Sequence, residues 1–242
     1  MRGGKAALDE KMQRLYEELG EEIDDQYGDW ALYLKKVEDG QTIGIHEDRQ
    51  MVAASLIKLF IAGAYYTAAE KGAIDASRFG NDPDIMLSRS DNDAANRLID
   101  ALSKEKINAF IRHWTLSTDP LTVLNRKMLE QNGTENYTTA QDCGRMLEDV
   151  LKGRYVSRKA SARILQDLRD QERTWKIPAG VPEGVETANK TGELTGVEND
   201  AAIIWGPDCT YILCIMSSGA GNGVGEIVEL SKIVYGALCT EP

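Results

Sequence analysis

The sequence predicts an α+β fold in which one antiparallel sheet is formed by strands from both ends of the chain and a helical segment is inserted between them. Strand-like patterns are confined to residues 30–45 and 184–216. The middle of the chain, from about residue 55 to residue 171, has helical periodicity broken by turns. The 242 residues suffice for one large domain or two small ones.

The first predicted element is an amphipathic helix from about Lys5 to Gln26. Its apolar residues recur at steps of three and four: Leu8, Met12, Leu15, Leu19 and Ile23. Two strands follow at residues 30–34 and 42–45. The Asp39-Gly40 pair between them favours a tight hairpin, because both central positions of such a turn require positive φ.

Four helix starts are predicted in the middle of the chain, at Ser55, Asp91, Ser103 and Thr139. The last third is different in character. Three strands are expected there, at residues 184–190, 200–205 and 211–216, with glycines between them. A final helix is expected over residues 225–238, where apolar residues share one face.

The composition limits the class of protein. Lys and Arg total 28 against 39 Asp and Glu, and the net charge of −11 argues against partners with phosphate backbones or anionic lipid surfaces. The apolar run at residues 59–69 is too short to span a membrane, and residues 1–8 lack the apolar core of a secretion signal. Two histidines and the absence of a C-x-x-C pair predict that no metal is bound.

The four cysteines are expected to be free thiols, mostly in the core: Cys143, Cys209, Cys214 and Cys239. Cys209 and Cys214 are separated by an odd number of positions along a strand-like stretch. Their side chains then point to opposite faces of the sheet, so these two cannot pair with each other.

An S-x-x-K pattern from Ser55 to Lys58 lies among apolar residues. On a helix these two positions share a face, and burial favours the neutral amine that is needed to take a proton from a serine hydroxyl. A helix cap is the alternative interpretation of Ser55. A second S-x-x-K, from Ser103 to Lys106, has charged neighbours, and there we interpret Ser103 as a helix N-cap.

Two further motifs each occur once. Ser90-Asp91-Asn92 is typical of a helix start capped by Asp91, and Lys190-Thr191-Gly192 lies at the predicted end of a strand. Taken alone, each also fits a plain structural role: a helix cap in the first case, a strand end with a surface lysine in the second.

Taken together and in this order, the three motifs resemble those of the penicillin-recognising serine hydrolases, which include the class A β-lactamases and the penicillin-binding proteins. The resemblance spans about residues 29–238 and includes the stretches 90–96 and 199–205. It implies a five-stranded antiparallel sheet flanked by helices, formed by residues 1–50 and 180–242. Residues 51–179 would form a helical subdomain, with the active site between the two parts.

The resemblance also implies roles for the motif residues. Ser55 would be acylated, Lys58 would take or relay its proton, and Ser90 would pass a proton to the leaving nitrogen beside Lys190. Asn92 and Thr191 would bind the substrate amide and carboxylate, and Gly192 would allow a substrate backbone to approach. The backbone N–H groups of Ser55 and Glu193 would form an oxyanion hole. With only two histidines, His46 and His113, a Ser-His-Asp triad is a poor alternative.

Three departures from the family pattern are visible. Glu193 replaces a small residue, and its carboxylate is expected to repel an anionic substrate. Met128 stands where class A β-lactamases have the glutamate that activates the deacylating water; Glu130 and Glu135 are the nearby substitutes, although we expect both to be solvated. Several class A β-lactamases have an arginine late in the chain that binds the substrate carboxylate, and no arginine here clearly matches it. Glu198 stands near the expected position, and Arg173 is an alternative.

We therefore expect a serine hydrolase that acts by acyl transfer on β-lactams, with weak deacylation and without metal or organic cofactor. A D-alanyl-D-alanine peptidase or amidase acting on peptidoglycan peptides is one alternative, and a penicillin-binding sensor that stays acylated is another. The substrates of this superfamily imply export from the cytoplasm. The partner is expected to be a small molecule, with no nucleic acid and no membrane span, and the protein is expected to be a monomer.

Overall fold

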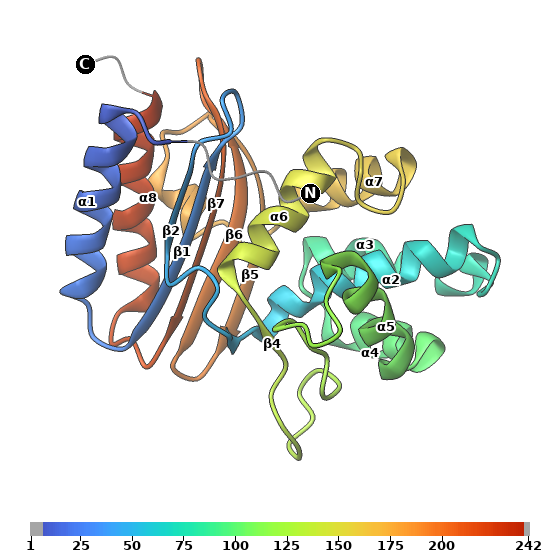
Figure 1. Ribbon diagram of the computed structural model, residues 1–242. Helices are drawn as coiled ribbons and strands as arrows, with labels where there is room; N and C mark the ends of the chain where they lie inside the picture. Colours follow the sequence, from blue (N-terminus) through green and yellow to red (C-terminus); the bar gives the residue numbers. More distant parts are fainter. Residues whose placement is uncertain (1–6, 240–242) are drawn as a thin grey trace.

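A five-stranded antiparallel sheet with the order β2-β1-β7-β6-β5 forms the centre of the molecule (Figure 1). The computed structural model describes residues 7–239. The strands are β1 (Asp29–Lys36), β2 (Thr42–Ile45), β5 (Glu186–Leu194), β6 (Val197–Trp205) and β7 (Thr210–Ser218). The chain enters the sheet at β1, leaves it after the edge strand β2 and returns at the opposite edge with β5, which confirms the predicted α+β class.

Two helices cover one face of the sheet, α1 (Glu10–Asp24) and α8 (Gly223–Cys239). Their buried residues form one apolar cluster with that face of the strands. The helix α1 begins later than predicted because the Asp9 side chain accepts a hydrogen bond from the N–H of Met12 at 2.8 Å and caps it. Lys5, the predicted start, lies outside the described residues.

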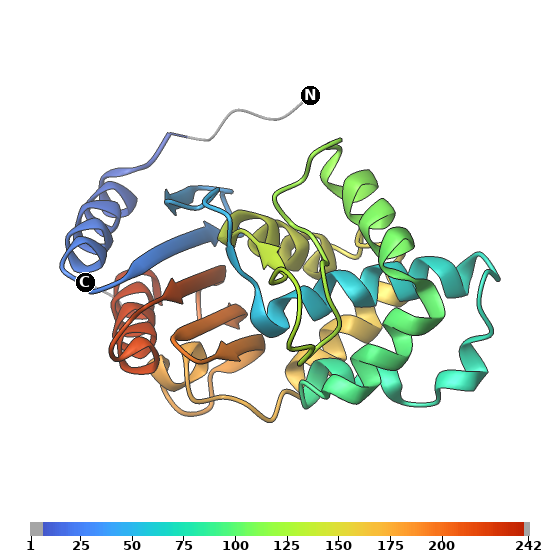
Figure 2. The ribbon, with the colours of Figure 1, turned by 90° about the horizontal axis from the view of Figure 1, so that it is seen from below.

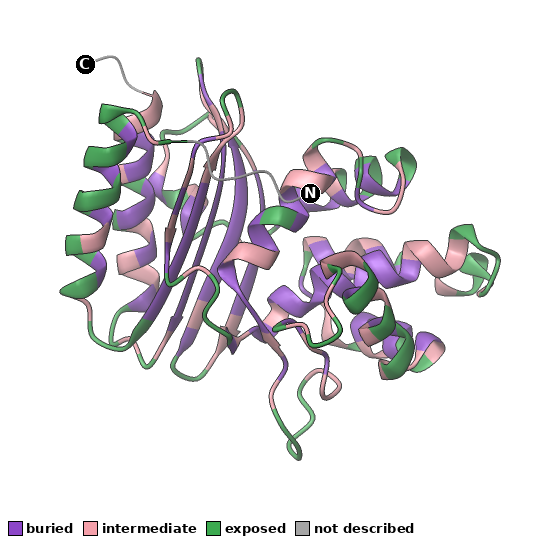
Figure 3. Cartoon of the chain, in the orientation of Figure 1, coloured by how far each residue is buried: buried purple, intermediate pink, exposed green. Residues whose placement is uncertain are grey.

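The other face of the sheet carries the helical part of the chain, as the view from below shows (Figure 2). Its helices are α2 (Lys58–Glu70), α3 (Asp82–Ser88), α4 (Asn92–Leu102), α5 (Lys104–Thr115), α6 (Ala140–Leu151) and α7 (Arg158–Arg169). Of these, α6 packs directly on the sheet, where Gly144 leaves room for the Tyr33 ring. Almost all of α2 up to Tyr65 is buried between its neighbours (Figure 3). The division into subdomains at residues 50 and 180 stays a prediction.

Three of the four predicted helix starts are confirmed, and the one at Ser55 differs. Asp91 accepts a hydrogen bond from the N–H of Ala94 at 2.7 Å, and Thr139 one from the N–H of Asp142 at 3.0 Å. Ser103 stands at the N-cap position of α5, as predicted, but with a φ of 71° its side chain makes no capping hydrogen bond. Ser55 does not cap a helix; it lies inside a short 3-10 turn, η1 (Ala54–Ile57).

Strand β5 is longer than predicted and reaches Leu194. The Lys190-Thr191-Gly192 motif is therefore in the body of a strand, and its predicted position at a strand end is wrong. A small two-stranded sheet of β3 (Met51–Val52) and β4 (Tyr137–Thr138) also forms. The sequence analysis did not predict this pair, because two-residue strands carry no periodic signal.

A disulfide joins Cys209 to Cys239, with 5.7 Å between their Cα atoms. The expectation of four free thiols is therefore wrong for this pair. The expectation is confirmed for Cys143 and Cys214, which are buried free thiols. The loop that enters β7 lies against the end of α8, a proximity that spacing along the chain does not reveal. Between residues 7 and 239, no helix combines the length and apolar character needed to cross a bilayer.

Candidate active site

Ser90 lies between two buried lysines that come from different parts of the fold. Lys58 begins α2, Ser90 directly precedes the cap of α4, and Lys190 belongs to β5. Lys190 Nζ donates a hydrogen bond to Ser90 Oγ at 2.9 Å, and Lys58 Nζ lies 3.2 Å from the same oxygen. Lys58 and Lys190 have 0% exposure and Ser90 has 4%. The structure thus brings one residue from each of the three motifs together.

Lys58 makes two further contacts that fix its amine. Its Nζ donates to the Ser90 carbonyl at 2.6 Å and to the Asn92 Oδ1 at 2.7 Å. Ser90 has a φ of 59°, so the chain turns through the left-handed region to present both its carbonyl and its hydroxyl to the amines. Backbone strain of this kind concentrates at functional sites.

Ser55 faces a narrow pocket of about 40 Å³, which also contacts Asn92, Met128 and Glu193. In the described part of the chain, its hydroxyl has no hydrogen-bond partner and is not bonded to Lys58. The hydroxyl is therefore available in a pocket that it shares with Asn92, a hydrogen-bond partner of Lys58. As the second residue of η1, Ser55 also has one of the N–H groups that lack a partner within their helix.

The turn that carries Ser55 is held against β5 and β6. Asn199 Nδ2 donates to the carbonyls of Val52 at 3.0 Å and Ala53 at 3.2 Å. Gly192 lets β5 approach this turn, because a Cβ atom there would lie 2.9 Å from the Ala53 carbonyl oxygen. The sequence analysis expected Gly192 to make room for substrate; in the structure its closest neighbour is the turn that positions Ser55.

The sheet register directs the backbone N–H of Glu193 out of the sheet. A two-residue turn joins Leu194 to Val197, so the backbone groups of these two residues bond to each other across the hairpin. Hydrogen-bonded and non-hydrogen-bonded pairs alternate in an antiparallel sheet, so Glu193 and Glu198 form the next, non-hydrogen-bonded pair. The backbone N–H and C=O groups of these two residues therefore point away from the partner strand. Thr191 has the same orientation, since its carbonyl accepts a hydrogen bond from Lys190 Nζ at 2.7 Å. Because β5 is an edge strand that packs on η1, these groups face the Ser55 turn.

Burial lowers the pKa of both lysines, so each protonated amine gives up its proton more readily than an exposed lysine does. Desolvation, with a smaller contribution from the Arg173 guanidinium, lowers the pKa of Lys58 to about 7. Desolvation, followed by the charges of Lys58 and Arg173, lowers the pKa of Lys190 well below its ordinary value. A substantial fraction of Lys58 is therefore neutral at pH 7 and able to accept a proton.

A charged cluster adjoins the motif residues on the side of β5. Arg173 Nη1 donates to Glu193 Oε2 at 2.6 Å. Lys176 Nζ lies 3.3 Å from Glu193 Oε1 and 2.6 Å from Glu198 Oε2, with 0% of its side chain exposed. Sequence reasoning named Arg173, Glu193 and Glu198 but missed Lys176. The signal in the sequence was a lysine directly before two apolar residues, Ile177 and Pro178. Such a pattern is too common to identify a buried, functional lysine.

The loop between α5 and β4 places Met128 in the Ser55 pocket. Asn96 on α4 clamps the Met128 backbone, accepting from its N–H at 2.8 Å and donating to its carbonyl at 3.2 Å. Glu135 lines the same pocket but is paired with Arg126, whereas Glu130 accepts from the N–H of Lys127 at 3.0 Å. Glu130 is exposed, as expected for a solvated carboxylate, whereas Glu135 is held in an ion pair with Arg126.

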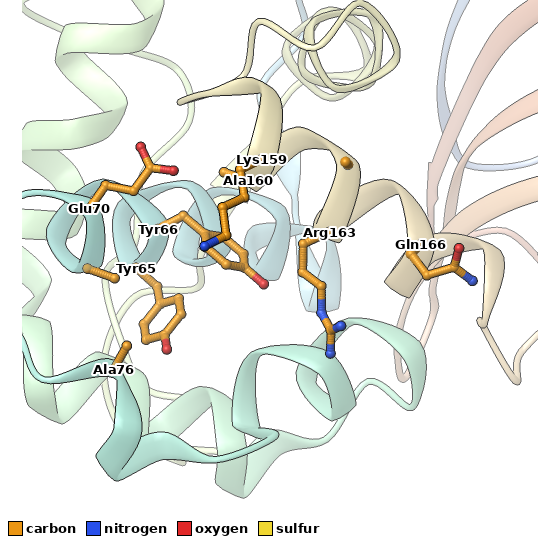
Figure 4. Close-up of a pocket in the computed structure, with 10 residues that line it drawn as sticks. Tyr65, Tyr66, Glu70, Ala76, Lys159, Ala160, Arg163 and Gln166 are labelled. Carbon is orange, nitrogen blue, oxygen red and sulfur yellow. The ribbon is translucent and has the colours of Figure 1, made fainter.

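Larger cavities lie away from these residues. One of about 610 Å³ lies between α2 and α7, where Tyr65, Tyr66 and Arg163 line it (Figure 4). It contains none of the motif residues, so its size does not make it the reactive site. His46 Nδ1 lies 3.1 Å from the Trp30 carbonyl oxygen, and His113 lines a different cavity. Neither histidine is beside Ser55, so the structure offers no Ser-His pair there.

The chain belongs to the β-lactamase enzyme family, whose family model matches residues 11–78 and 84–238. By this membership it is a serine β-lactamase-like hydrolase. No curated protein sequence matches significantly.

Solved structures share the fold. A β-lactamase from Sphaerobacter thermophilus is 22% identical, with a TM-score of 0.84 over 97% of this chain and 100% of its own. The protein PBP-A is 23% identical, with a TM-score of 0.83 over 93% of this chain and 96% of its own. An ancestral class A β-lactamase is 20% identical, with a TM-score of 0.81 over 93% and 100%. At these identities the likeness shows the fold alone.

Proposed function

We propose that the protein is acylated at Ser55 by β-lactams and hydrolyses them slowly. The observation that supports this most directly is the hydrogen-bonded cluster of Lys58, Ser90 and Lys190, which contacts the Ser55 pocket through Asn92. A mutant of PBP-A, which shares the fold, has been solved as an acyl-enzyme complex with penicillin G.

In this mechanism Lys58 is the base for acylation. Its lowered pKa of about 7 lets the neutral amine take the Ser55 proton, either directly or with the Ser90 hydroxyl as a relay. The attacking oxygen forms a bond to the lactam carbonyl carbon and the ring C–N bond breaks. Ser90, which accepts from Lys190, then delivers a proton to the nitrogen that leaves.

The oxyanion and the side chain of the substrate have fitting partners. The outward N–H of Glu193 and the free N–H of Ser55 supply two donors for the oxygen that becomes negative. The amide oxygen of Asn92 accepts a hydrogen bond from Lys58, so the amide nitrogen of Asn92 is the group that can donate to a substrate carbonyl. Among the described residues, Thr191 Oγ1 is buried without a hydrogen-bond partner, and it offers a donor next to Lys190.

Deacylation lacks a dedicated base. The thioether of Met128 cannot activate water, and Glu135, the carboxylate in the same pocket, is held by Arg126. We therefore expect the acyl-enzyme to form faster than it hydrolyses. The same observation favours a second candidate function, a D-alanyl-D-alanine peptidase or an acylated sensor, for which fast penicillin hydrolysis is unnecessary.

The compartment is also a proposal. Disulfides persist mainly in oxidising surroundings, and the Cys209–Cys239 bridge therefore supports action outside the cytoplasm, where cell-wall peptides and β-lactams meet.

Intact-protein mass measured against time after addition of benzylpenicillin tests the function. Ser55→Ala is the test variant, and Ser103→Ala, in the other S-x-x-K, is the matched control. We expect a penicilloyl adduct in the wild type and in Ser103→Ala, none in Ser55→Ala, and slow loss of the adduct. Loss faster than mixing would contradict slow deacylation, and no adduct in the wild type would contradict the function. Release of D-alanine from a cell-wall peptide would favour the second candidate.

A further inference from the structure

The Glu193 side chain lies at the Ser55 pocket between two cations. It directly follows the Lys190-Thr191-Gly192 motif and lines the pocket of Ser55. Its two carboxylate oxygens face two cations, with Arg173 Nη1 at 2.6 Å from Oε2 and Lys176 Nζ at 3.3 Å from Oε1. The positive groups nearest the pocket on this side are thus already occupied by an internal anion.

The charges in this cluster balance. Arg173 and Lys176 are positive, whereas Glu193 and Glu198 are negative, and Glu198 Oε2 lies 2.6 Å from the Lys176 amine. Lys176 is fully buried, so its charge needs these partners inside the protein. Burial also lowers the pKa of Lys58 and Lys190, which favours the uncharged form of each amine. Arg173 and Lys176 are both compensated and leave no excess positive charge on this side of the pocket for an incoming anion.

A carboxylate that enters such a site loses water without gaining a cation and meets the Glu193 carboxylate as a like charge. An uncharged carbonyl avoids both costs and can still accept a hydrogen bond from the unpartnered Thr191 hydroxyl. The electrostatics therefore favour acyl donors that are neutral at this end.

We propose that Glu193 is a specificity-determining residue whose carboxylate occupies the anion position between Arg173 and Lys176, so that the site selects acyl donors without a carboxylate next to the scissile amide. The proposal rests on the function proposed above, because it concerns the substrates of the same site.

The test compares benzylpenicillin, which carries that carboxylate, with its neutral methyl ester. Second-order acylation rates are measured by intact mass in the wild type, in Glu193→Gln and in the control Glu198→Gln. The control removes a charge from the same Lys176 but does not line the pocket. Glu193→Gln keeps the backbone N–H, and thermal melting confirms that each variant is folded.

We expect the wild type to favour the ester, and the ester-to-acid ratio to fall by about tenfold in Glu193→Gln, equivalent to about 1.4 kcal/mol. The ratio in Glu198→Gln should fall by less than in Glu193→Gln, because Glu198 compensates Lys176 from outside the pocket and the Glu193 carboxylate still stands inside it. An unchanged ratio in Glu193→Gln would overturn the proposal.

A second measurement does not depend on acylation. Sodium acetate is titrated at constant ionic strength, and backbone amide shifts near residues 173 and 193 report its binding. We expect acetate to bind Glu193→Gln about tenfold more tightly than the wild type, since one carboxylate is removed from between two cations. Equal affinities would contradict the proposal. If neither penicillin forms an adduct, the proposed function fails, and the acetate titration alone decides this inference.

Discussion

Lys190 Nζ and Ser90 Oγ lie 2.9 Å apart, although 100 residues separate them in the sequence. The contact joins the edge strand of the sheet to the start of α4 in the helical part. Lys58 reaches the same hydroxyl at 3.2 Å, so one serine connects the two amines. Proton movement between nucleophile and leaving group can therefore pass through Ser90.

Ser90→Ala should slow acylation without unfolding the protein. Removal of the shared hydroxyl breaks the path from Lys58 to the leaving nitrogen, and positioned proton transfer contributes about 10²-fold or more. Stopped-flow or quenched-mass kinetics with benzylpenicillin measure the rate. Thr138→Ala is a control, because it removes a buried hydroxyl whose partners are Thr122 and Cys143 and neither lysine. Unchanged acylation in Ser90→Ala would argue against the proton path.

Acylation should rise with pH around neutrality. The base is the neutral form of Lys58, whose pKa is lowered to about 7, so protonation below that pH removes the base and slows the reaction. Arg173 disfavours the charged amine; replacing it with Met should raise the pKa of Lys58 and move the rise to higher pH.

The pH dependence of the acylation rate measures this shift. Arg169→Met is the matched control, because Arg169 pairs with Glu186 at the far start of β5. A profile for Arg173→Met that coincides with the wild type, or moves to lower pH, would be inconsistent with Lys58 as the base.

Met128→Glu should accelerate deacylation. The Asn96 clamp holds this backbone position in the Ser55 pocket, so a carboxylate introduced there can activate water near the acyl group. We expect the lifetime of the penicilloyl adduct to fall by about tenfold or more, at the low end of general-base effects. Met128→Gln is the matched control, because glutamine has nearly the size of glutamate but cannot act as a base. Equal adduct lifetimes in the two variants would show that this position does not supply the base.

Loss of the disulfide should lower stability but not the acylation rate. The Cys209–Cys239 bridge closes a loop over a separation of 30 residues and lies on the far side of the sheet from Ser55. Cys209→Ser should cost about 2–4 kcal/mol of unfolding free energy, as measured by denaturant melts. Thiol titration of the unfolded, unreduced wild type should find two free thiols, Cys143 and Cys214. Four reactive thiols would mean that the bridge does not form.

The sequence predicted the parts of the site that local patterns encode. Ser55 and Lys58 are close in sequence, Asp91 caps a helix by a local hydrogen bond, and β5 to β7 alternate with turn residues. These features depend on neighbours within a few positions, where periodicity and capping rules apply. The assembly of the three motifs was inferred from their order, which resembles a known family.

Long-range side-chain contacts were not accessible in this way. Nothing in the sequence indicates that Lys176 meets both Glu193 and Glu198, or that Cys209 meets Cys239, because each pairing depends on how β5, β6, β7 and α8 pack. Gly192 was linked to substrate from its motif alone. Its contact with Ala53 is visible only once the strand and the Ser55 turn are placed together.

The most direct test of the account is the location of the acyl group. After a short exposure to benzylpenicillin, the protein is digested and the modified peptide is sequenced by tandem mass spectrometry. The account predicts a penicilloyl group on Ser55, and the same peptide unmodified in Ser55→Ala. A penicilloyl group on Ser90, Ser103 or any other residue, persisting in Ser55→Ala, would contradict it.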